Sequence, residues 1–340
     1  MKKSIVLILV VLSIIACKNN TNKSTVSKTQ VQEKAEYPSD VIPFMEEWKI
    51  LLGDGTYQDS LVNYQKKDFF FVENDGTTNW VVYKTPNSGI TSRTSSNTRT
   101  ELGQKKHWIP EVGGKLSGTL KVQHVSTTGD ATVPSSYSVV IGQIHSDEGH
   151  ENEPLKIYYK KFPGHQKGSV FWNYEINTKG DNIGRFDHSN AVWGYDFSVV
   201  GSNSNLYPEE PKDGIELGEE FSYEVNVYKG IMYLTFTSEN HKTVHFTKSL
   251  IQSEFTTKET IPEQVKRMYA NKEKGGGVER EIAYAGEINY FKQGAYNQAN
   301  GKSTKSKTYN GDILKQYANG SYAEVWFKKG FVGNSEKPKN

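Results

Sequence analysis

The 340-residue sequence predicts an all-β protein, a sandwich or jelly roll of antiparallel strands, on three observations. From residue 43 onward, short runs alternate apolar and polar residues and are rich in β-branched and aromatic side chains, as half-buried strands are. Gly-containing turn signals separate these runs. No long run has the helical period, and the composition does not shift again after residue 38. We therefore expect one β domain over 39–333, followed by a disordered tail over 334–340.

The N-terminus has the pattern of an export signal. Lys2 and Lys3 precede an apolar run over 5–15 that is too short to span a bilayer. Ala16 and Cys17 follow, and a lone cysteine at this point resembles the lipobox of bacterial lipoproteins, whose thiol is lipidated. An ordinary signal peptide with an incidental cysteine is the alternative. We expect a signal peptide over 1–16, lipidation at Cys17, and a flexible polar tether over 17–38.

Cysteine count and charge exclude several classes of function. Cys17 is the only cysteine, so a lipidated Cys17 leaves a domain without disulfides, zinc–thiolate sites or a cysteine nucleophile. Lysine and arginine together number 41 and aspartate and glutamate 39, and loss of Lys2 and Lys3 with the signal makes the two counts equal. A chain without net charge is not steered to nucleic acid, and an acidic ligand would need a local groove. We expect a monomer.

The expected strands lie, in chain order, at 69–72, 80–83, 99–103, 116–125, 137–145, 157–160, 169–176, 221–227, 231–236, 281–298 and 322–327. Turn signals stand at Asp75-Gly76, Gly113-Gly114, Lys229-Gly230 and Asn319-Gly320. One short helix is expected over 262–271, because Pro262 lies near its start and three glycines at 275–277 follow its end. The long connections 177–216 and 239–279 are either lids or binding loops, or plain surface excursions.

Three expected strands carry polar side chains at alternate positions, which places those side chains on one face of a sheet. The polar sets are Arg99 and Glu101 opposite Leu102, Gln143 and His145 opposite Val140 and Ile144, and Tyr290, Lys292, Tyr296 and Gln298 with Phe291 and Ala295 behind. Such a face predicts a polar groove over an apolar core.

These three segments also resemble a known family. Arg99-Thr100-Glu101-Leu102, Gln143-Ile144-His145 and the nine residues Tyr290 to Gln298 resemble, in the same order, the signature strands of alginate lyases of polysaccharide lyase family 7. Weaker similarities extend the resemblance over about residues 44–332. It implies a jelly-roll sandwich of two antiparallel sheets with a concave substrate groove. The family commonly has a second arginine where this chain has Gly103, and Lys105 is the expected substitute.

The resemblance implies that the enzyme cleaves alginate by β-elimination, in which the proton on C5 beside a carboxylate is removed and the 4-linked oxygen leaves. It assigns Arg99 and Gln143 to neutralise that carboxylate, a task that suits a bidentate guanidinium and an amide donor. His145 is the expected base and Tyr296 the expected acid. Glu101, Lys292, Gln298 and Tyr290 are the expected substrate-binding residues, and Glu101 also orients Arg99.

The scheme needs no cofactor and no metal. A metal site could be formed by His145, Asp147, Glu148 and His150, but adjacent acidic residues in a Gly-containing loop are usually solvated. A glycosidase would need a pair of carboxylates, and the matched strands offer only Glu101.

The expected function is therefore a lipid-anchored alginate lyase of the bacterial cell envelope, at the outer membrane, on its periplasmic or outer face. Ile144 between glutamine and histidine resembles members that accept guluronate. The long connections favour attack from chain ends. The alternatives are a non-catalytic carbohydrate-binding module on the same fold, or a lyase for another polyuronate such as glucuronan.

Overall fold

The computed structural model describes residues 33–91, 95–147, 152–178, 186–262, 277–300 and 312–338. The chain divides into two compact units, 1–31 and 32–340, and all described residues belong to the second. The signal peptide, Cys17 and the tether up to residue 32 therefore lie outside the described residues. No helix among the described residues is long and apolar enough to cross a membrane.

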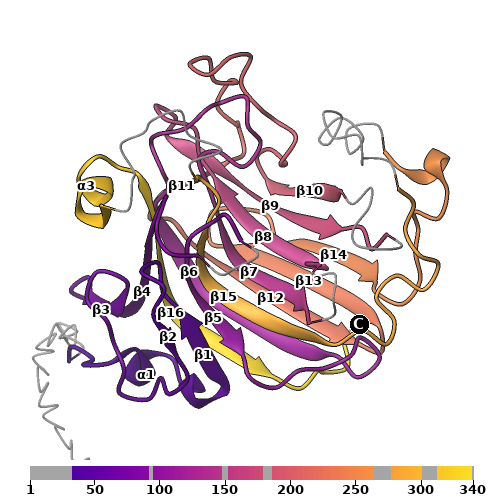
Figure 1. Ribbon diagram of the computed structural model, residues 1–340, viewed down its shortest axis with the longest axis horizontal. Helices are drawn as coiled ribbons and strands as arrows, with labels where there is room; N and C mark the ends of the chain where they lie inside the picture. Colours follow the sequence, from indigo (N-terminus) through magenta and orange to yellow (C-terminus); the bar gives the residue numbers. More distant parts are fainter. Residues whose placement is uncertain are drawn as a thin grey trace, which may run out of the picture. The chain divides into compact units, whose positions relative to one another are not determined.

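The described part of the chain forms two antiparallel sheets (Figure 1). The first contains β1 (Trp48–Leu51), β2 (Tyr57–Gln58), β5 (Arg99–Gln104), β7 (Ser138–Ser146), β8 (Leu155–Lys160), β9 (Lys167–Glu175), β10 (Asp187–Trp193), β11 (Ile215–Glu216) and β15 (Asn289–Asn297). Its order is β10-β9-β8-β7-β15-β5-β1-β2, with β11 paired to β9. Strands far apart in sequence, such as β5 and β15, are therefore direct neighbours.

The second sheet contains β3 (Phe70–Asn74), β4 (Asn79–Pro86), β6 (Gly114–His124), β12 (Glu220–Tyr228), β13 (Ile231–Ser238), β14 (Val244–Ser249) and β16 (Tyr322–Gly333). Its order is β14-β13-β12-β6-β16-β4-β3. The described helices are short: α1 (Pro38–Val41), α3 (Ile313–Ala318), and the 3₁₀ turns η1 (Met45–Glu47) and η2 (Lys258–Thr260). The predicted all-β sandwich of two antiparallel sheets is confirmed.

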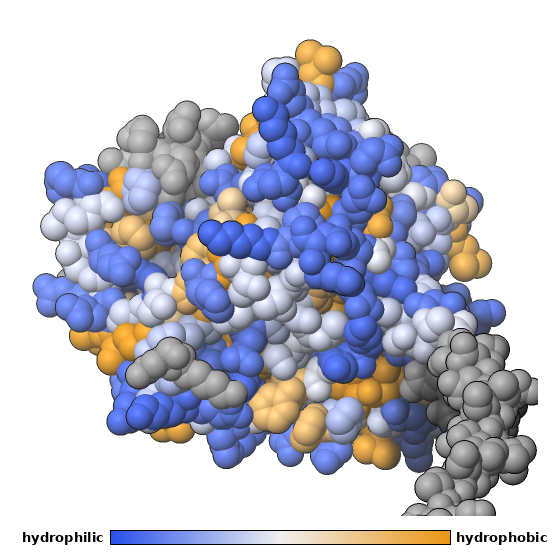
Figure 2. All heavy atoms as spheres, turned by 180° about the vertical axis from the view of Figure 1, so that it is seen from behind, coloured by the Kyte–Doolittle hydropathy of each residue, from blue (hydrophilic) through white to orange (hydrophobic). Residues whose placement is uncertain are grey.

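Apolar side chains from both sheets meet in one core between the layers. Strand alternation explains this, because every second residue points to the same face. Leu102, Ile144 and Phe291 of the first sheet are at most 1% exposed, and so are Leu116 and Val225 of the second. The face seen in Figure 2 is covered mainly by hydrophilic and near-neutral side chains, with hydrophobic ones in small groups. The face of the first sheet that points away from this core can therefore carry polar groups.

Most of the predicted strands are present, and the errors have physical causes. The strand expected over 281–298 begins only at Asn289, because 280–287 folds into successive turns with positive φ at Ala283 and Gly286. The two long connections contain β10, β11 and β14. Both β10 and β14 pair with a single neighbour at a sheet edge, and edge strands carry polar residues that hide the alternation.

Two further predictions concern the helix over 262–271 and the C-terminal tail. The helix expected over 262–271 lies almost entirely outside the described residues. The tail expected to be disordered makes contacts where it is described. The Glu336 carboxylate lies 2.7 Å from Lys115 Nζ, and the Glu336 amide donates to Asn226 Oδ1 at 3.0 Å. These contacts hold this part of the tail against the second sheet.

Strand β7 contradicts one predicted facing. Val140 was expected in the core, opposite Gln143 and His145, but it packs beside Tyr296 on the outer face of the first sheet. The register of β7 against β8 shifts between Val140 and Gly142. Ile141 and Gly142 both face the core, so the strand contains a β-bulge whose extra residue reverses the alternation.

The bulge depends on a glycine. A Cβ at Gly142 would lie 2.6 Å from the Tyr223 hydroxyl oxygen, which itself donates to the Ile141 carbonyl at 3.2 Å and accepts from Gln293 Nε2 at 2.7 Å. We expect Gly142→Ala to lower the free energy of unfolding by about 1–3 kcal/mol, as overpacked cores do. Urea denaturation measures the change.

Gly103→Ala on β5 is the matched control. A Cβ there would meet nothing nearer than Lys49 Cε at 3.6 Å, so we expect a change within about 0.5 kcal/mol. Equal stability of Gly142→Ala and wild type would contradict the tight packing at the bulge.

Candidate active site

A groove of about 850 Å³ lies on the outer face of the first sheet. Strands β1, β2, β5, β7, β8 and β15 and the segments at 90–91 and 95–97 contribute its lining. Of the eight predicted catalytic and substrate-binding residues, the groove is lined by Arg99, Glu101, His145, Tyr290, Lys292, Tyr296 and Gln298. Sheet pairing explains this convergence, because β15 lies between β7 and β5.

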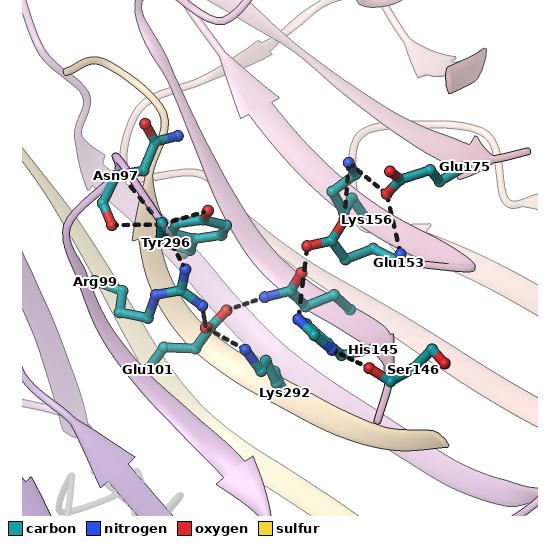
Figure 3. Close-up of polar contacts among 12 residues, drawn as sticks. Asn97, Arg99, Glu101, His145, Ser146, Glu153, Lys156, Glu175, Lys292 and Tyr296 are labelled. Carbon is teal, nitrogen blue, oxygen red and sulfur yellow. Dashed lines mark hydrogen bonds and ion pairs between the residues drawn. The ribbon is translucent and has the colours of Figure 1, made fainter. Parts of the chain in front are cut away.

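The Glu101 carboxylate is the centre of the polar network (Figure 3). Arg99 Nη1 donates to it at 3.2 Å, Gln143 Nε2 donates to it at 2.5 Å, and Lys292 Nζ lies 3.7 Å away. Glu101 is 3% exposed, and a carboxylate this buried is stable only when paired. The predicted pairing of Glu101 with Arg99 is present, and the carboxylate joins strands β5, β7 and β15.

Gln143 has a different place from the other predicted residues. Its side chain is fully buried and does not line the groove, and its amide nitrogen donates to Glu101. An amide carries two N–H donors, and one of them is used in this bond. Gln143 thus forms the floor beneath the groove, beside Glu101.

Arg99 and Tyr296 form a second contact in the groove. The guanidinium carbon lies 3.8 Å from the centre of the Tyr296 ring, a cation–π stack. Ser95 Oγ joins the two, since it accepts from Arg99 Nη2 at 3.0 Å and lies 3.2 Å from the Tyr296 hydroxyl. This arrangement fixes the Tyr296 ring and places its hydroxyl beside a hydrogen-bonding partner.

His145 is held in a defined tautomer. Its Nδ1 lies 2.6 Å from the Ser146 carbonyl, and because a carbonyl only accepts, Nδ1 carries the proton and Nε2 keeps its lone pair. Burial lowers the pKa of His145 to about 3, and the Lys292 ammonium acts in the same direction. Glu153 opposes this effect, with its carboxylate 3.7 Å from Nε2. His145 is thus a neutral imidazole that can accept a proton.

Tyr290 supports His145 from the side. Its ring lies 5.2 Å from the His145 ring and stacks on His107 at 4.7 Å with an interplanar angle of 15°. His107 Nδ1 in turn lies 3.1 Å from an Asp147 carboxylate oxygen. Burial raises the pKa of Tyr290, so its hydroxyl remains protonated at neutral pH. Tyr290 limits the positions that the imidazole can take.

The groove also contains residues that the sequence analysis missed, notably Ser95, Glu153 and Lys156. Ser95 precedes the first matched segment, and Glu153 precedes β8. Neither residue lies in an alternating polar pattern from which a place in the groove could have been predicted. Lys156 lies on a strand whose polar positions look like those of any half-exposed strand.

The position of Gly103 is covered by a neighbouring strand. Lys49 of β1 pairs with Gly103, and its Cε would lie 3.6 Å from a Cβ at that position. Lys49 also lines the groove. The expectation that Lys105 would substitute is wrong, because Lys105 Nζ donates to the Glu46 carbonyl and is not part of the lining. The cation next to Gly103 comes from β1.

No group of three or more His, Cys, Asp or Glu side chains that could hold a metal ion occurs among the described residues. Glu148 and His150, two of the possible metal ligands identified in the sequence, lie outside the described residues.

Comparisons with known proteins agree with this geometry. A family model described as alginate lyase matches residues 42–333. An alginate lyase of Klebsiella pneumoniae is 29% identical over 269 residues, which cover 69% of this chain and 73% of that protein. The crystal structure of an alginate lyase from Klebsiella pneumoniae, at 24% identity and a TM-score of 0.63, shares the fold, and the match covers 89% of this chain and 100% of that one.

A second solved structure is much more similar. The exolytic PL7 alginate lyase AlyA5 from Zobellia galactanivorans is 70% identical, with a TM-score of 0.88. The match covers 90% of this chain and 100% of that one.

Lys292 and His145 are electrostatically coupled, and the coupling can be measured. NMR titration of the imidazole should show wild-type His145 neutral from about pH 8 to pH 5, whereas Lys292→Met should raise its pKa. An unfolded histidine titrates near pH 6.5. The neutral His145 therefore contributes its full stability above that pH, and the contribution declines as the pH falls toward the folded pKa.

Lys105→Met is the matched control, because it removes a lysine that lies outside the groove lining. A wild-type midpoint near the unfolded value, or equal shifts in both variants, would contradict the coupling.

Proposed function

The chain belongs to the alginate lyase family, and on that basis we propose that this alginate lyase attacks guluronate-containing chains from their ends, with His145 as the base and Tyr296 as the acid. One observation carries the residue roles. His145 and Tyr296 stand on either side of the cluster formed by Arg99, Glu101 and Lys292 (Figure 3). A neutral imidazole and a phenol hydroxyl thus flank the groups that can neutralise a uronate carboxylate.

The first step of the elimination is limited by the substrate's own charge. A carboxylate makes the neighbouring C5–H a very poor acid, because removal of the proton adds a second negative charge. Arg99 and Lys292 supply positive charge, and Gln143 supplies an amide donor, at the place where that charge develops. These donors are already held by Glu101, so little reorganisation is needed when the substrate binds.

Proton transfer completes the reaction. His145 Nε2 accepts the C5 proton, the C4–C5 double bond forms, and the C4–O bond breaks. The Tyr296 hydroxyl donates its proton to the leaving oxygen, and Arg99 stacked on its ring stabilises the phenolate that remains. The imidazolium formed at His145 faces the Glu153 carboxylate at 3.7 Å. Transfer of one proton from His145 to Tyr296, directly or through solvent, restores both groups.

The preference for guluronate is supported by the placement of these two groups. In guluronate the C5 proton and the leaving oxygen lie on opposite sides of the ring, which suits a separate base and acid. Ile144, the residue that resembles guluronate-accepting members, is buried in the core. Its influence on the substrate would therefore act through the position of Gln143 and His145.

Attack from chain ends is supported by the 70% identity to an exolytic alginate lyase. It is also supported by the described lining of the groove, which continues past Arg99 to Lys49 and Tyr57 on the side of β1 and β2 but ends at Glu153 and Lys156 on the side of β8. We further propose that the enzyme acts as a monomer, and a dimer in light scattering would contradict this.

Membrane attachment through Cys17 is a proposal from the sequence alone, for a protein held at the outer membrane. The support is the basic and apolar stretch before the chain's only cysteine. Cys17→Ser should move the protein from the membrane fraction to the soluble fraction. Unchanged membrane association of this variant would contradict lipidation.

The reaction can be tested through the new double bond, which absorbs in the ultraviolet. The full chain, incubated separately with polyguluronate and polymannuronate, should generate absorbance faster on polyguluronate. His145→Ala and Tyr296→Phe should each lower kcat by about 100-fold or more, the usual contribution of a proton-transfer group. Wild-type kcat in either variant would overturn the assigned role.

Two variants control this experiment. Tyr57→Phe removes a hydroxyl at the far side of the groove and should leave kcat unchanged. Lys49→Met removes the cation beside Gly103 and should raise KM about fivefold with little change in kcat, since a partly exposed charge contributes about 1 kcal/mol to binding. Absorbance on neither polymer, with measurable binding of another polyuronate, would correct the substrate.

A further inference from the structure

The contacts of the Ser95 hydroxyl determine what it can offer to Tyr296. Ser95 Oγ accepts from Arg99 Nη2 at 3.0 Å and from the Asn97 amide at 3.2 Å. It also lies 3.2 Å from the Asn97 carbonyl and 3.2 Å from the Tyr296 hydroxyl. A serine hydroxyl has two lone pairs and one proton, so the two bonds that it accepts occupy both lone pairs. Ser95 can therefore only donate toward Tyr296.

The direction of this bond determines where the Tyr296 proton points. A phenol hydroxyl that receives the Ser95 proton cannot place its own proton on the same bond. Within the described part of the chain, Ser95 is the only side chain within hydrogen-bond distance of the Tyr296 hydroxyl. The Tyr296 proton is therefore left for a group in the groove, which under the proposed function is the leaving oxygen.

Backbone contacts hold Ser95 beside Tyr296. The Asn297 amide donates to the Thr98 carbonyl at 3.0 Å, so the segment before β5 is bonded to β15 at the residue that follows Tyr296. Asn97 and Tyr296 lie close together in the site (Figure 3). The Asn97 amide in turn holds Ser95 Oγ, in the local side-chain-to-backbone bond that serine commonly makes two residues along the chain. The position of the hydroxyl thus follows from strand pairing.

Arg99 strengthens the hydrogen bond that Ser95 can give. Its guanidinium donates to Ser95 Oγ, and the guanidinium carbon lies 3.8 Å from the centre of the Tyr296 ring. Arg99 is only 8% exposed, so water and salt screen its charge little. A hydroxyl that accepts from a cation becomes a stronger donor, because hydrogen bonds in a chain polarise one another. Ser95 thus directs part of the positive charge of Arg99 to the Tyr296 oxygen.

We propose that Ser95 is a positioning residue for proton transfer by Tyr296. Before reaction, the Ser95 hydroxyl divides its proton between the Asn97 carbonyl and the Tyr296 oxygen. When the Tyr296 O–H bond breaks and the proton bonds to the leaving oxygen, the Ser95 hydroxyl turns to the phenolate, because hydrogen bonds to ionised groups are stronger than those to a carbonyl. Ser95 keeps its own proton throughout. This inference rests on the proposed role of Tyr296 as the acid.

The test is Ser95→Ala in the full chain, measured by ultraviolet absorbance on the polymer that the wild type cleaves faster. We expect kcat to fall about 10–100-fold, the contribution of a hydrogen bond to a charged group. KM should stay unchanged, because Glu101 still holds Arg99. Ser95→Thr keeps a hydroxyl at this position and should restore kcat close to the wild-type value. Equal loss of kcat in Ser95→Thr and Ser95→Ala would overturn the proposal.

Ser88→Ala is the matched control for loss of a serine hydroxyl. Ser88 belongs to the same connection between β4 and β5, but it does not line the groove. Its loss should leave kcat and KM at the wild-type values. A fall in kcat as large as that of Ser95→Ala would mean that any change in this connection lowers activity, and it would overturn the specific role of Ser95.

A double variant separates this inference from the proposed acid. If Ser95 acts through Tyr296, Ser95→Ala should change kcat little once Tyr296→Phe has removed the phenol hydroxyl. A further fall by the factor seen in the wild-type background would overturn the proposal. Low kcat in Tyr296→Phe together with wild-type kcat in Ser95→Ala would overturn the role of Ser95 alone. Wild-type kcat in Tyr296→Phe would overturn the acid, and the role of Ser95 with it.

Discussion

The buried Glu101 carboxylate is the interaction on which the site depends. It accepts from Arg99 and Gln143 and lies beside Lys292, so a single side chain of β5 fixes groups from three adjacent strands. A carboxylate that is 3% exposed would be costly without these partners. The partners in turn are cations and an amide that would repel or drift from one another without it. The carboxylate and its donors therefore stabilise one arrangement, the one able to receive a second carboxylate from the groove.

The charges around His145 determine when it can accept a proton. Burial and the Lys292 ammonium keep His145 neutral. The Glu153 carboxylate lies 3.7 Å from Nε2, where it can stabilise the imidazolium once a proton has been accepted. A bound uronate adds negative charge beside Lys292 and weakens its effect on His145. Substrate binding should therefore raise the basicity of the imidazole at the moment when a base is needed.

Alternation along single strands was enough to predict the two-sheet sandwich and most of the polar face, because Arg99 with Glu101 and Gln143 with His145 follow the strand period. The resemblance to known lyases supplied their roles. Contacts between strands could not be predicted in this way. Lys49 covers Gly103 only because β1 and β5 pair in one register, and the aromatic cluster of Tyr158, Phe171 and Phe197 brings β8, β9 and the connection after β10 together. The turns at 280–287 also have a strand-like pattern that their backbone does not follow.

The β-bulge in β7 connects the site to the buried aromatic cluster of Tyr158, Phe171 and Phe197. In a regular strand, Val140 and Gln143 would point to opposite faces, because they are three positions apart. Either Gln143 and His145 would turn into the core, or Val140 would leave the aromatic cluster and its contact with Tyr296. With Ile141 and Gly142 both facing the core, one strand serves both the site and the aromatic cluster. Gly142, which packs against Tyr223, is thus the condition for placing the proposed base His145 and Val140 of the aromatic cluster on the same face of the sheet.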